Sequence, residues 1–220
     1  MIIGISGKKQ SGKDFAAKII HGYLTEAEEV VEEQLKTPNM SINYNDSLSI
    51  VKFADPVKDI VCIILNCTRE ELEDPEFKEK TLGFEWTKQI KEEGLTIYKV
   101  LTPRLLLQMV GTDIFHNLIH PNIWVNILMK KYSEGTKDFI VPDVRFPNEV
   151  VAILNKQDSF IIRVEREDVE YSDQHSSETS LDEYPFDNVV HWDTPESLQI
   201  QIKEILKKAN LLSNETHKRS

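Results

Sequence analysis

The segment Gly7-Lys8-Lys9-Gln10-Ser11-Gly12-Lys13 constrains the fold of this chain more than any other, because it matches the pattern G-x-x-x-x-G-K. It follows an apolar stretch, residues 1–6, expected to form a buried strand, and precedes residues 13–24, expected to form a helix. In that context glycines let backbone N–H groups turn inward and hold phosphate oxygens, and the helix N-terminus adds a partial positive charge. Lys13 would reach the β- and γ-phosphates. The segment therefore predicts a nucleoside triphosphate-binding loop rather than an ordinary glycine-rich turn.

The residue after the loop lysine departs from the usual pattern. Ser or Thr is common there, with its hydroxyl on Mg²⁺, whereas this chain has Asp14. A carboxylate is also a good oxygen ligand for Mg²⁺. We expect Asp14 to bind the metal directly or through water, and the alternative is that it only interacts favourably with the helix N-terminus.

Strand-like and helix-like segments alternate along the rest of the chain. Further strands are expected at residues 48–53, 138–143, 159–164 and 189–192, and further helices at 55–65, from 102 onward, at 123–132, 148–155 and 195–209. This alternation predicts an α/β fold with a parallel sheet covered on both faces. Other segments are expected to be a solvated acidic helix end (26–33), a loop (37–47), a charged excursion (73–101) and a mobile acidic stretch (165–183).

Charged residues at two other places are candidates for anion binding. Asp143 ends an apolar strand and Arg145 follows it, at the sheet edge where ligands bind in open α/β folds and where a second acid can lie near Mg²⁺. The alternative for this pair is a surface salt bridge. Arg104 lies in the first turn of a helix, where a cation is unfavourable, so we expect it to be held by a bound phosphate or by a carboxylate. Asp55 could be only a helix cap, and Trp124 could belong to the core.

The composition excludes several classes of protein. The 220 residues carry a formal net charge of −11, which argues against long nucleic acids as partners but allows a small anion in a local basic pocket. No apolar run approaches the roughly 18 residues that a membrane span needs. Cys62 and Cys67 have no histidines at metal-ligand spacing, and no secretory signal is recognisable, so we expect a reducing, cytoplasmic location without a zinc site or disulfide framework.

Five segments taken in order resemble bacteriophage-type deoxynucleoside monophosphate kinases, within the P-loop nucleotide kinase superfamily. The segments are 7–14, 53–58, 104–113 with Trp124 after it, 143–149 and 175–178, the last resembling a His-x-x-Glu lid segment. The resemblance extends from residue 3 to about 205. Two features depart from it: Phe15 replaces the usual Thr, and residues 70–101 do not align.

The resemblance implies a fold and a function. The fold is a three-layer P-loop kinase in a single domain over residues 1–210, with a helical monophosphate-binding region at about 53–132, a lid at about 165–186 and a polar tail at 211–220. The implied activity is ATP-dependent phosphorylation of deoxynucleoside 5′-monophosphates to diphosphates with Mg²⁺, in the cytoplasm, or the host cytoplasm if the protein is viral. Free nucleotides are the expected partners, without long nucleic acid or membrane. An exposed face at residues 105–110 would indicate a homodimer.

The resemblance also implies roles for individual residues. ATP binding falls to Gly7, Lys8, Lys9, Gln10, Ser11, Gly12, Lys13, Asp14 and Thr194. Acceptor binding falls to Asp55, Lys58, Arg104, Gln108, Asp113, Trp124 and Arg145, and metal binding to Asp14 and Asp143. The catalytic residues are Lys13, Arg145 and Arg166, with Arg166 or Arg163 entering the site with the lid. His175 is expected to be a solvated histidine rather than a general base.

Three other functions remain open. Animal phosphomevalonate kinases share the Ser-Gly-Lys-Asp-Phe loop and an Asp-Val-Arg segment, so a small-molecule P-loop kinase is the closest alternative. A nucleotide-binding switch with negligible turnover is the second. A nucleic-acid end kinase is the third, and the acidic charge balance disfavours it.

Overall fold

The computed structural model describes residues 1–26, 47–92, 95–135, 137–166 and 175–212. It divides into two compact units, one formed by Met1–Lys52 and Ile127–Ser220 and the other by Phe53–Asn126. The second unit begins where the monophosphate-binding region is expected and ends at Asn126 rather than near residue 132. Most of the acidic run and loop expected at residues 26–47 lies outside the described residues, as do much of the lid and of the tail.

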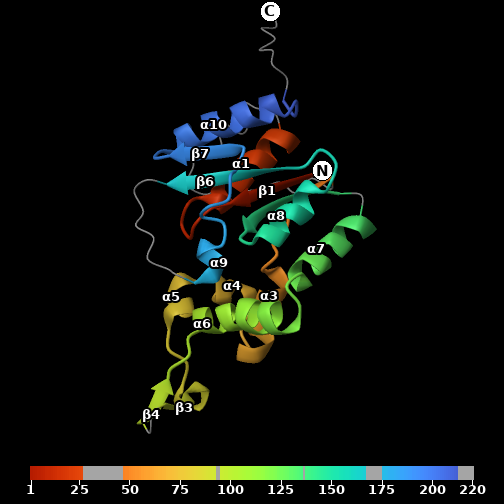
Figure 1. The fold of residues 1–220 in the computed structure, drawn as a ribbon. Helices are drawn as coiled ribbons and strands as arrows, with labels where there is room; N and C mark the ends of the chain where they lie inside the picture. The colour runs from red at the N-terminus through yellow and green to blue at the C-terminus, as the bar shows by residue number, and fades with distance from the viewer. Residues whose placement is uncertain (27–46, 93–94, 136, 167–174, 213–220) are drawn as a thin grey trace, which may run out of the picture. The chain divides into compact units, whose positions relative to one another are not determined.

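The first unit is built on a five-stranded parallel sheet (Figure 1). Its strands are β1 (Ile2–Ser6), β2 (Leu48–Ile50), β5 (Asp138–Val144), β6 (Phe160–Arg166) and β7 (Asn188–Trp192), in the spatial order β2-β5-β1-β6-β7. β1 is buried along its whole length at the centre of the sheet, as its apolar sequence predicts. The predicted parallel α/β sheet is confirmed.

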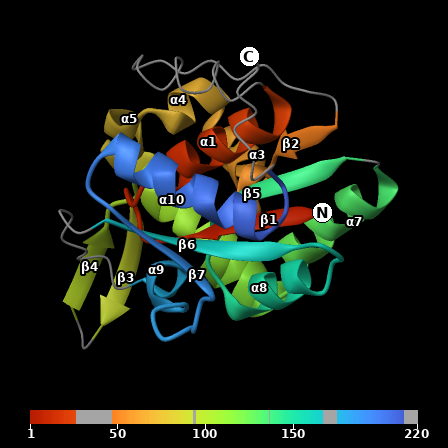
Figure 2. The same cartoon turned by 90° about the horizontal axis from the view of Figure 1, so that it is seen from above.

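Helices cover both faces of this sheet (Figures 1 and 2). Ile3 and Ile5 pack into one core with α1 (Lys13–Thr25) and α10 (Pro195–Lys208). Gly4, which points to the other face because side chains alternate along a strand, faces Ile153 of α8 (Pro147–Leu154). A methyl group at Gly4 would lie 3.0 Å from Ile153, so the close approach of α8 depends on this glycine. The arrangement is three-layered.

β5 contains an extra residue next to Pro142. The register pairs Gly4 with Val141 but Ser6 with Val144, so three steps along β5 match two steps along β1. Proline cannot donate a ladder hydrogen bond, and central strands tolerate it at bulges of this kind. The bulge therefore lies at the carboxyl end of β5, beside Asp143.

The second unit is mainly helical, with one two-stranded antiparallel sheet. Its elements are α3 (Asp55–Leu65), α4 (Arg69–Glu73), α5 (Pro75–Glu79), the 3₁₀ turn η1 (Phe84–Trp86), the strands β3 (Lys88–Glu92) and β4 (Leu95–Lys99), α6 (Pro103–Gln108) and the π-helical segment η2 (Met109–Ile119). The helix α7 (Ile123–Glu134) begins in the last residues of the second unit, and the rest of it belongs to the first unit. Thr68 and Thr102 cap α4 and α6 through their side chains.

β2 is shorter than the strand expected at residues 48–53, because it ends at Ile50, although Val51 still donates to the carbonyl of Ile140 at 3.0 Å. β6 remains paired with β7 as far as Arg166, so residues 165 and 166, near the expected start of the lid, belong to the sheet. Leu106 and Val110 are buried, so the exposed face at residues 105–110 that would indicate a homodimer is not present, and the homodimer stays a prediction.

Among the described residues, no helix is long and apolar enough to cross a membrane.

Candidate active site

The phosphate loop follows β1 and adopts a backbone that requires glycine at two places. Gly7 and Gly12 have φ angles of +152° and +94°, a region that side-chain-bearing residues rarely adopt. A β-carbon on Gly7 would also collide with the carbonyl oxygen of Val164, and one on Gly12 would lie 2.5 Å from a ring carbon of Trp192. The loop is therefore packed tightly against β6 and β7.

Lys13, the first residue of α1, is buried beneath this loop. Its ammonium group donates a hydrogen bond to the carbonyl oxygen of Lys8. The pKa of Lys13 is lowered from 10.5 to about 8, chiefly by burial and also by the positive charge of Arg145, while the carboxylates of Glu178, Asp14 and Asp143 act in the opposite direction. The loop lysine, the arginine and these acids thus lie within electrostatic reach of one another.

Trp192 supports the loop from β7, a role that sequence reasoning missed. Its indole N–H donates to the carbonyl of Ser11 at 2.7 Å, and its ring covers Gly12. The guanidinium of Arg166, at the end of β6, lies 4.8 Å from the centre of the same ring. Arg166 is therefore placed by the sheet, on the residue that supports the loop.

A buried glutamate shapes the turn after β5. Glu149, 4% exposed, accepts the backbone N–H groups of Arg145 at 2.6 Å and Phe146 at 3.0 Å. The pKa of Glu149 is raised to about 8, chiefly by burial and also by the charge of Asp143, while the two N–H donors and the charge of Arg145 act in the opposite direction. The sequence signal for this role is an acid three residues after the residue that precedes the helix.

The segment around α9 (Ser176–Thr179) makes several contacts with the loop side of the unit. Glu178 accepts the N–H of Lys9 at 2.9 Å and pairs with Arg145. Asp182 pairs with Lys8 at 2.5 Å. None of these acids was predicted as a site residue beyond the His-x-x-Glu resemblance.

Arg163 and His175 have structural roles here. The guanidinium of Arg163 is buried in β6, donates to the hydroxyl of Ser6 at 3.2 Å and lies 3.7 Å from Asp182. It does not belong to a lid. His175 is half-buried and is the N-terminal cap of α9, where its Nδ1 accepts the N–H of Ser177 at 3.3 Å.

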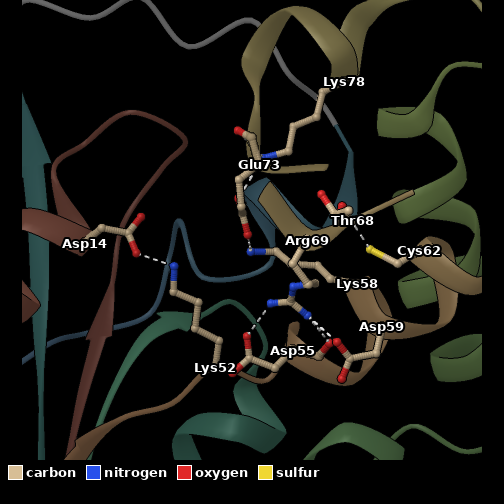
Figure 3. A network of polar contacts seen from close by, with 10 residues as sticks. All are labelled: Asp14, Lys52, Asp55, Lys58, Asp59, Cys62, Thr68, Arg69, Glu73 and Lys78. Atoms are coloured by element: carbon tan, nitrogen blue, oxygen red, sulfur yellow. Dashed lines mark hydrogen bonds and ion pairs between the residues drawn. The ribbon is translucent and has the colours of Figure 1, made fainter. Parts of the chain in front are cut away.

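Two carboxylates could hold a metal. Asp14 has a largely exposed side chain that pairs with Lys52 at 2.5 Å, and Asp143 is 8% exposed at the carboxyl end of β5 (Figure 3 shows Asp14 and Lys52). Both act on the charge of Lys13. The part of the chain that the structure describes contains no cluster of three or more His, Cys, Asp or Glu suited to a metal. Two carboxylates beside a phosphate loop fit Mg²⁺, which commonly uses one or two carboxylates together with substrate phosphates.

In the second unit, predicted acceptor residues take part in ion pairs (Figure 3). Arg69 donates to the backbone carbonyl of Asp55 at 2.8 Å and to its carboxylate at 3.0 Å, and also to Asp59 at 2.7 Å. Asp55 is therefore fixed by an arginine rather than serving as the cap of α3, whose capping position is Ala54. Lys58 pairs with Glu73, which Lys78 also contacts at 3.0 Å.

Arg104, in the first turn of α6, has the partner that its unfavourable position requires. Its Nε donates to the carboxylate of Glu79, so the ion-pair alternative is present in the structure. Binding of a phosphate by the rest of the guanidinium stays a prediction.

The remaining predicted residues differ in exposure. Trp124 is 6% exposed, donates its N–H to the carbonyl of Gly111 at 2.7 Å and packs on Phe115, which is a core role. Asp113 is exposed in η2, Gln108 ends α6, and Thr194 uses its hydroxyl to cap α10 by accepting the N–H of Ser197 at 3.2 Å. A contact of these residues with a nucleotide stays a prediction.

Comparison with known proteins identifies the family. The family model described as "Deoxynucleotide monophosphate kinase" matches residues 36–202, which is most of the chain. The chain belongs to the deoxynucleotide monophosphate kinase family. It is 28% identical over 191 residues to the deoxynucleoside-5'-monophosphate kinase of Escherichia phage T5, covering 68% of this chain and 70% of the relative. It is 25% identical over 195 residues, 82% of both chains, to a protein of Acanthamoeba polyphaga mimivirus provisionally described as a deoxynucleotide monophosphate kinase.

The family match and the loop geometry are separate observations. The matched residues include the whole second unit and the segments around Asp143 and Glu178, but they begin after the phosphate loop. The loop is identified by its sequence and by the backbone at Gly7 and Gly12. A deoxynucleotide monophosphate kinase needs both a nucleotide-binding loop and an acceptor site, so the two observations complement each other.

Proposed function

We propose that this chain transfers the γ-phosphoryl group of ATP to a deoxynucleoside 5′-monophosphate. The observation that carries the proposal is a glycine-dependent phosphate loop with a buried Lys13 in a chain of the deoxynucleotide monophosphate kinase family. The proposed partners are free nucleotides, and the proposed location is the cytoplasm.

The donor nucleotide is held by the first unit. Backbone N–H groups of the loop and the N-terminus of α1 bind the phosphates, and Lys13 contacts the β- and γ-phosphates. The lowered pKa of Lys13 reflects burial next to Arg145, and phosphate oxygens would compensate both cations. Arg145 and Arg166 neutralise the charge of the transferring group.

Mg²⁺ is the proposed cofactor, with Asp14 and Asp143 as ligands directly or through water. When bound, the ion neutralises phosphate charge and orients the phosphates. For Asp14 to contribute, its ion pair with Lys52 must open, which costs little because the Asp14 side chain is 69% exposed.

The proposed contacts of the acceptor monophosphate in the second unit are charged and polar side chains. Arg104 and Lys58 supply positive charge for the acceptor phosphate, and Asp55, Gln108, Asp113 and Trp124 are the other proposed contacts. Phosphoryl transfer relies on positioning and charge stabilisation more than on a strong base. His175 is therefore not needed as a base.

The test is a panel of acceptors in a coupled assay of ADP release. The panel contains the four deoxynucleoside monophosphates, phosphomevalonate and a 5′-hydroxyl oligonucleotide, each with Mg²⁺ and ATP. Stimulation by one or more deoxynucleoside monophosphates is expected. Stimulation only by phosphomevalonate or the oligonucleotide would replace the proposed substrate, and slow hydrolysis without stimulation would indicate a nucleotide-binding switch.

Lys13→Ala provides the internal control. It should reduce turnover by orders of magnitude and leave the fold intact, because it removes the charge on the transferring phosphates. Near-normal activity in this variant would contradict the assignment of the loop.

A further inference from the structure

Glu178 joins two parts of the first unit that are far apart in sequence. One carboxylate oxygen accepts the backbone N–H of Lys9 in the phosphate loop at 2.9 Å. The other pairs with Nη1 of Arg145, in the turn that follows β5. The side chain is only 8% exposed, so both oxygens are used away from solvent.

The segment that carries Glu178 is held by contacts of its own. Arg145 donates to the backbone carbonyl of Ser177 at 3.1 Å, and Asp182 pairs with Lys8 at 2.5 Å. Leu181, between these anchors, is 3% exposed. The position of Glu178 is therefore fixed from both sides, and its contacts are not those of a loose surface side chain.

The charges around Glu178 explain why a buried acid is tolerated there. Arg145 lies close enough to Lys13 for its charge to lower the pKa of the lysine, so the two cations repel each other. The charge of Glu178 acts on Lys13 in the opposite direction. A buried charge that is both paired and hydrogen-bonded is tolerated, and the charge of Glu178 also offsets the repulsion between the buried Lys13 and the half-buried Arg145.

We propose that Glu178 is a positioning residue for phosphoryl transfer, which holds Arg145 and the phosphate-loop backbone at Lys9 in one fixed arrangement. The inference rests on the proposed function. Glu178 touches no reacting atom in it and acts through Lys9 and Arg145. Misplacement of a positioning group by about 1 Å can cost roughly 100-fold in rate. Loss of the contacts of Glu178 with Lys9 and Arg145 should therefore lower mainly kcat.

The same contacts suggest a rival role with the opposite consequence. The carboxylate of Glu178, bound to a loop N–H and to an arginine, could occupy the position of an ATP phosphate. ATP would then have to displace this carboxylate in order to bind. In that case removing Glu178 would tighten ATP binding. If Glu178 positions the site, its removal leaves the affinity for ATP unchanged or weakens it.

The experiment compares Glu178→Ala and Glu178→Gln with the wild-type protein. Steady-state assays give kcat and the KM of the monophosphate, and calorimetry gives the Kd of ATP without acceptor. We expect Glu178→Ala to lower kcat by about tenfold or more while the Kd of ATP does not decrease. Glu178→Gln keeps an oxygen for the Lys9 N–H but loses the charge that pairs with Arg145, so its kcat should lie between those of the wild-type protein and Glu178→Ala. Glu178→Gln also preserves the shape of the side chain, so it replaces Glu178→Ala in the test if the alanine variant does not fold.

Glu183→Gln is the matched control, because it removes the same charge from an exposed residue of the same segment. It should retain wild-type kcat. A double-mutant cycle with Arg145→Ala adds a readout that loss of stability would not imitate. If Glu178 acts through Arg145, the kcat of the double variant should be less than about threefold below the kcat of Arg145→Ala alone.

Three results would overturn the proposal: wild-type kcat in Glu178→Ala, fully multiplicative effects in the cycle, or tighter ATP binding. Failure of the proposed function would look different, since the wild-type protein would then phosphorylate no monophosphate. The variants would in that case be compared in acceptor-independent ATP hydrolysis, where wild-type rates in Glu178→Ala would again overturn the positioning role.

Discussion

The indole N–H of Trp192 donates a hydrogen bond to the carbonyl oxygen of Ser11, 2.7 Å away, and joins the last strand of the sheet to the phosphate loop. The two residues are separated by 181 positions in the sequence. The phosphate loop is therefore supported by a strand far along the sequence, and its geometry depends on the packing of β7 as well as on its own glycines.

Trp192→Phe should destabilise the protein and weaken ATP binding. Phenylalanine keeps an aromatic ring but removes the N–H, which leaves a buried carbonyl without its donor at a cost of about 1–2 kcal/mol. Urea unfolding and the KM of ATP measure the two effects. Trp86→Phe, in η1 of the other unit, is the control and should leave the KM of ATP unchanged. Equal effects of the two substitutions would contradict a specific role for Trp192.

Gly12→Ala should impair nucleotide binding even though it adds a single methyl group. The backbone at Gly12 has φ +94°, and the new β-carbon would meet the ring of Trp192 at 2.5 Å. We expect a loss of ATP affinity of about tenfold or more, measured by calorimetry. Gly135→Ala adds the same methyl group where its closest neighbour is 3.4 Å away, and it should bind ATP normally. Normal ATP affinity in Gly12→Ala would show that the loop can relax around the added group.

Lys13→Met should make the protein more stable at neutral pH while abolishing turnover. Burial lowers the pKa of Lys13 from 10.5 to about 8, so below pH 8 the charged lysine penalises folding. The full shift corresponds to about 3 kcal/mol, and loss of the hydrogen bond to Lys8 reduces the expected gain to about 1–2 kcal/mol. The gain should shrink as the pH rises from 8 towards 10.5, because the folded lysine loses its proton first. Urea unfolding at pH 7 and pH 10 tests this, and a less stable variant at pH 7 would refute it.

Arg104→Ala should raise the KM of the monophosphate by about tenfold and leave the KM of ATP unchanged. The guanidinium uses its Nε on Glu79, and the proposal assigns the remaining donors to the acceptor phosphate. Lys80→Ala, which removes an exposed cation from the same unit, should change neither constant. If Arg104→Ala leaves both KM and kcat of the acceptor reaction unchanged, the Glu79 ion pair is the whole role of this residue.

Glu73→Gln should lower the stability of the protein at neutral pH, and this difference from the wild-type protein should disappear as the pH falls. Burial raises the pKa of Glu73, but hydrogen bonds and ion pairs with Lys58 and Lys78 lower it more, to about 2. A lowered carboxylate pKa stabilises the fold above pH 4.5, and this contribution is lost as the pH falls from 4.5 to 2. The carboxylate is half exposed, so the effect at pH 7 should be below about 1 kcal/mol. Glu76→Gln is the control, and a pH-independent difference would contradict the ion-pair explanation.

Local signals predicted much of this structure. The apolar run before Gly7, the glycines of the loop and the start of α1 are adjacent in sequence, so their geometry follows from near neighbours. The parallel sheet followed from alternating strands and helices. The β3–β4 pair was missed although Glu93-Gly94 separates two strand-like runs, because the many charged residues obscured the alternation.

The partners of the charged groups could not be predicted. Arg145 pairs with Glu178, but 37 acidic residues were candidates, and only the folded chain brings one of them to the arginine. The same holds for Arg104 and Glu79, and for Trp192 and Ser11. Sequence periodicity identifies which residues share a face of one element, whereas these contacts join elements through the tertiary fold.

The extra residue beside Pro142 sets which way β5 presents its last side chains. With strict alternation, Asp143 would follow Val141 onto the face that packs against α8, and Val144 would turn to the opposite face. The bulge reverses this parity, since Val144 lies 3.2 Å from the site of a β-carbon on Gly4, on the α8 side. Without the bulge, the four residues from Val141 to Val144 would direct the carboxylate of Asp143 towards the apolar contact between Gly4 and Ile153. The extra residue therefore keeps the last valine of β5 in the apolar layer and the acid out of it.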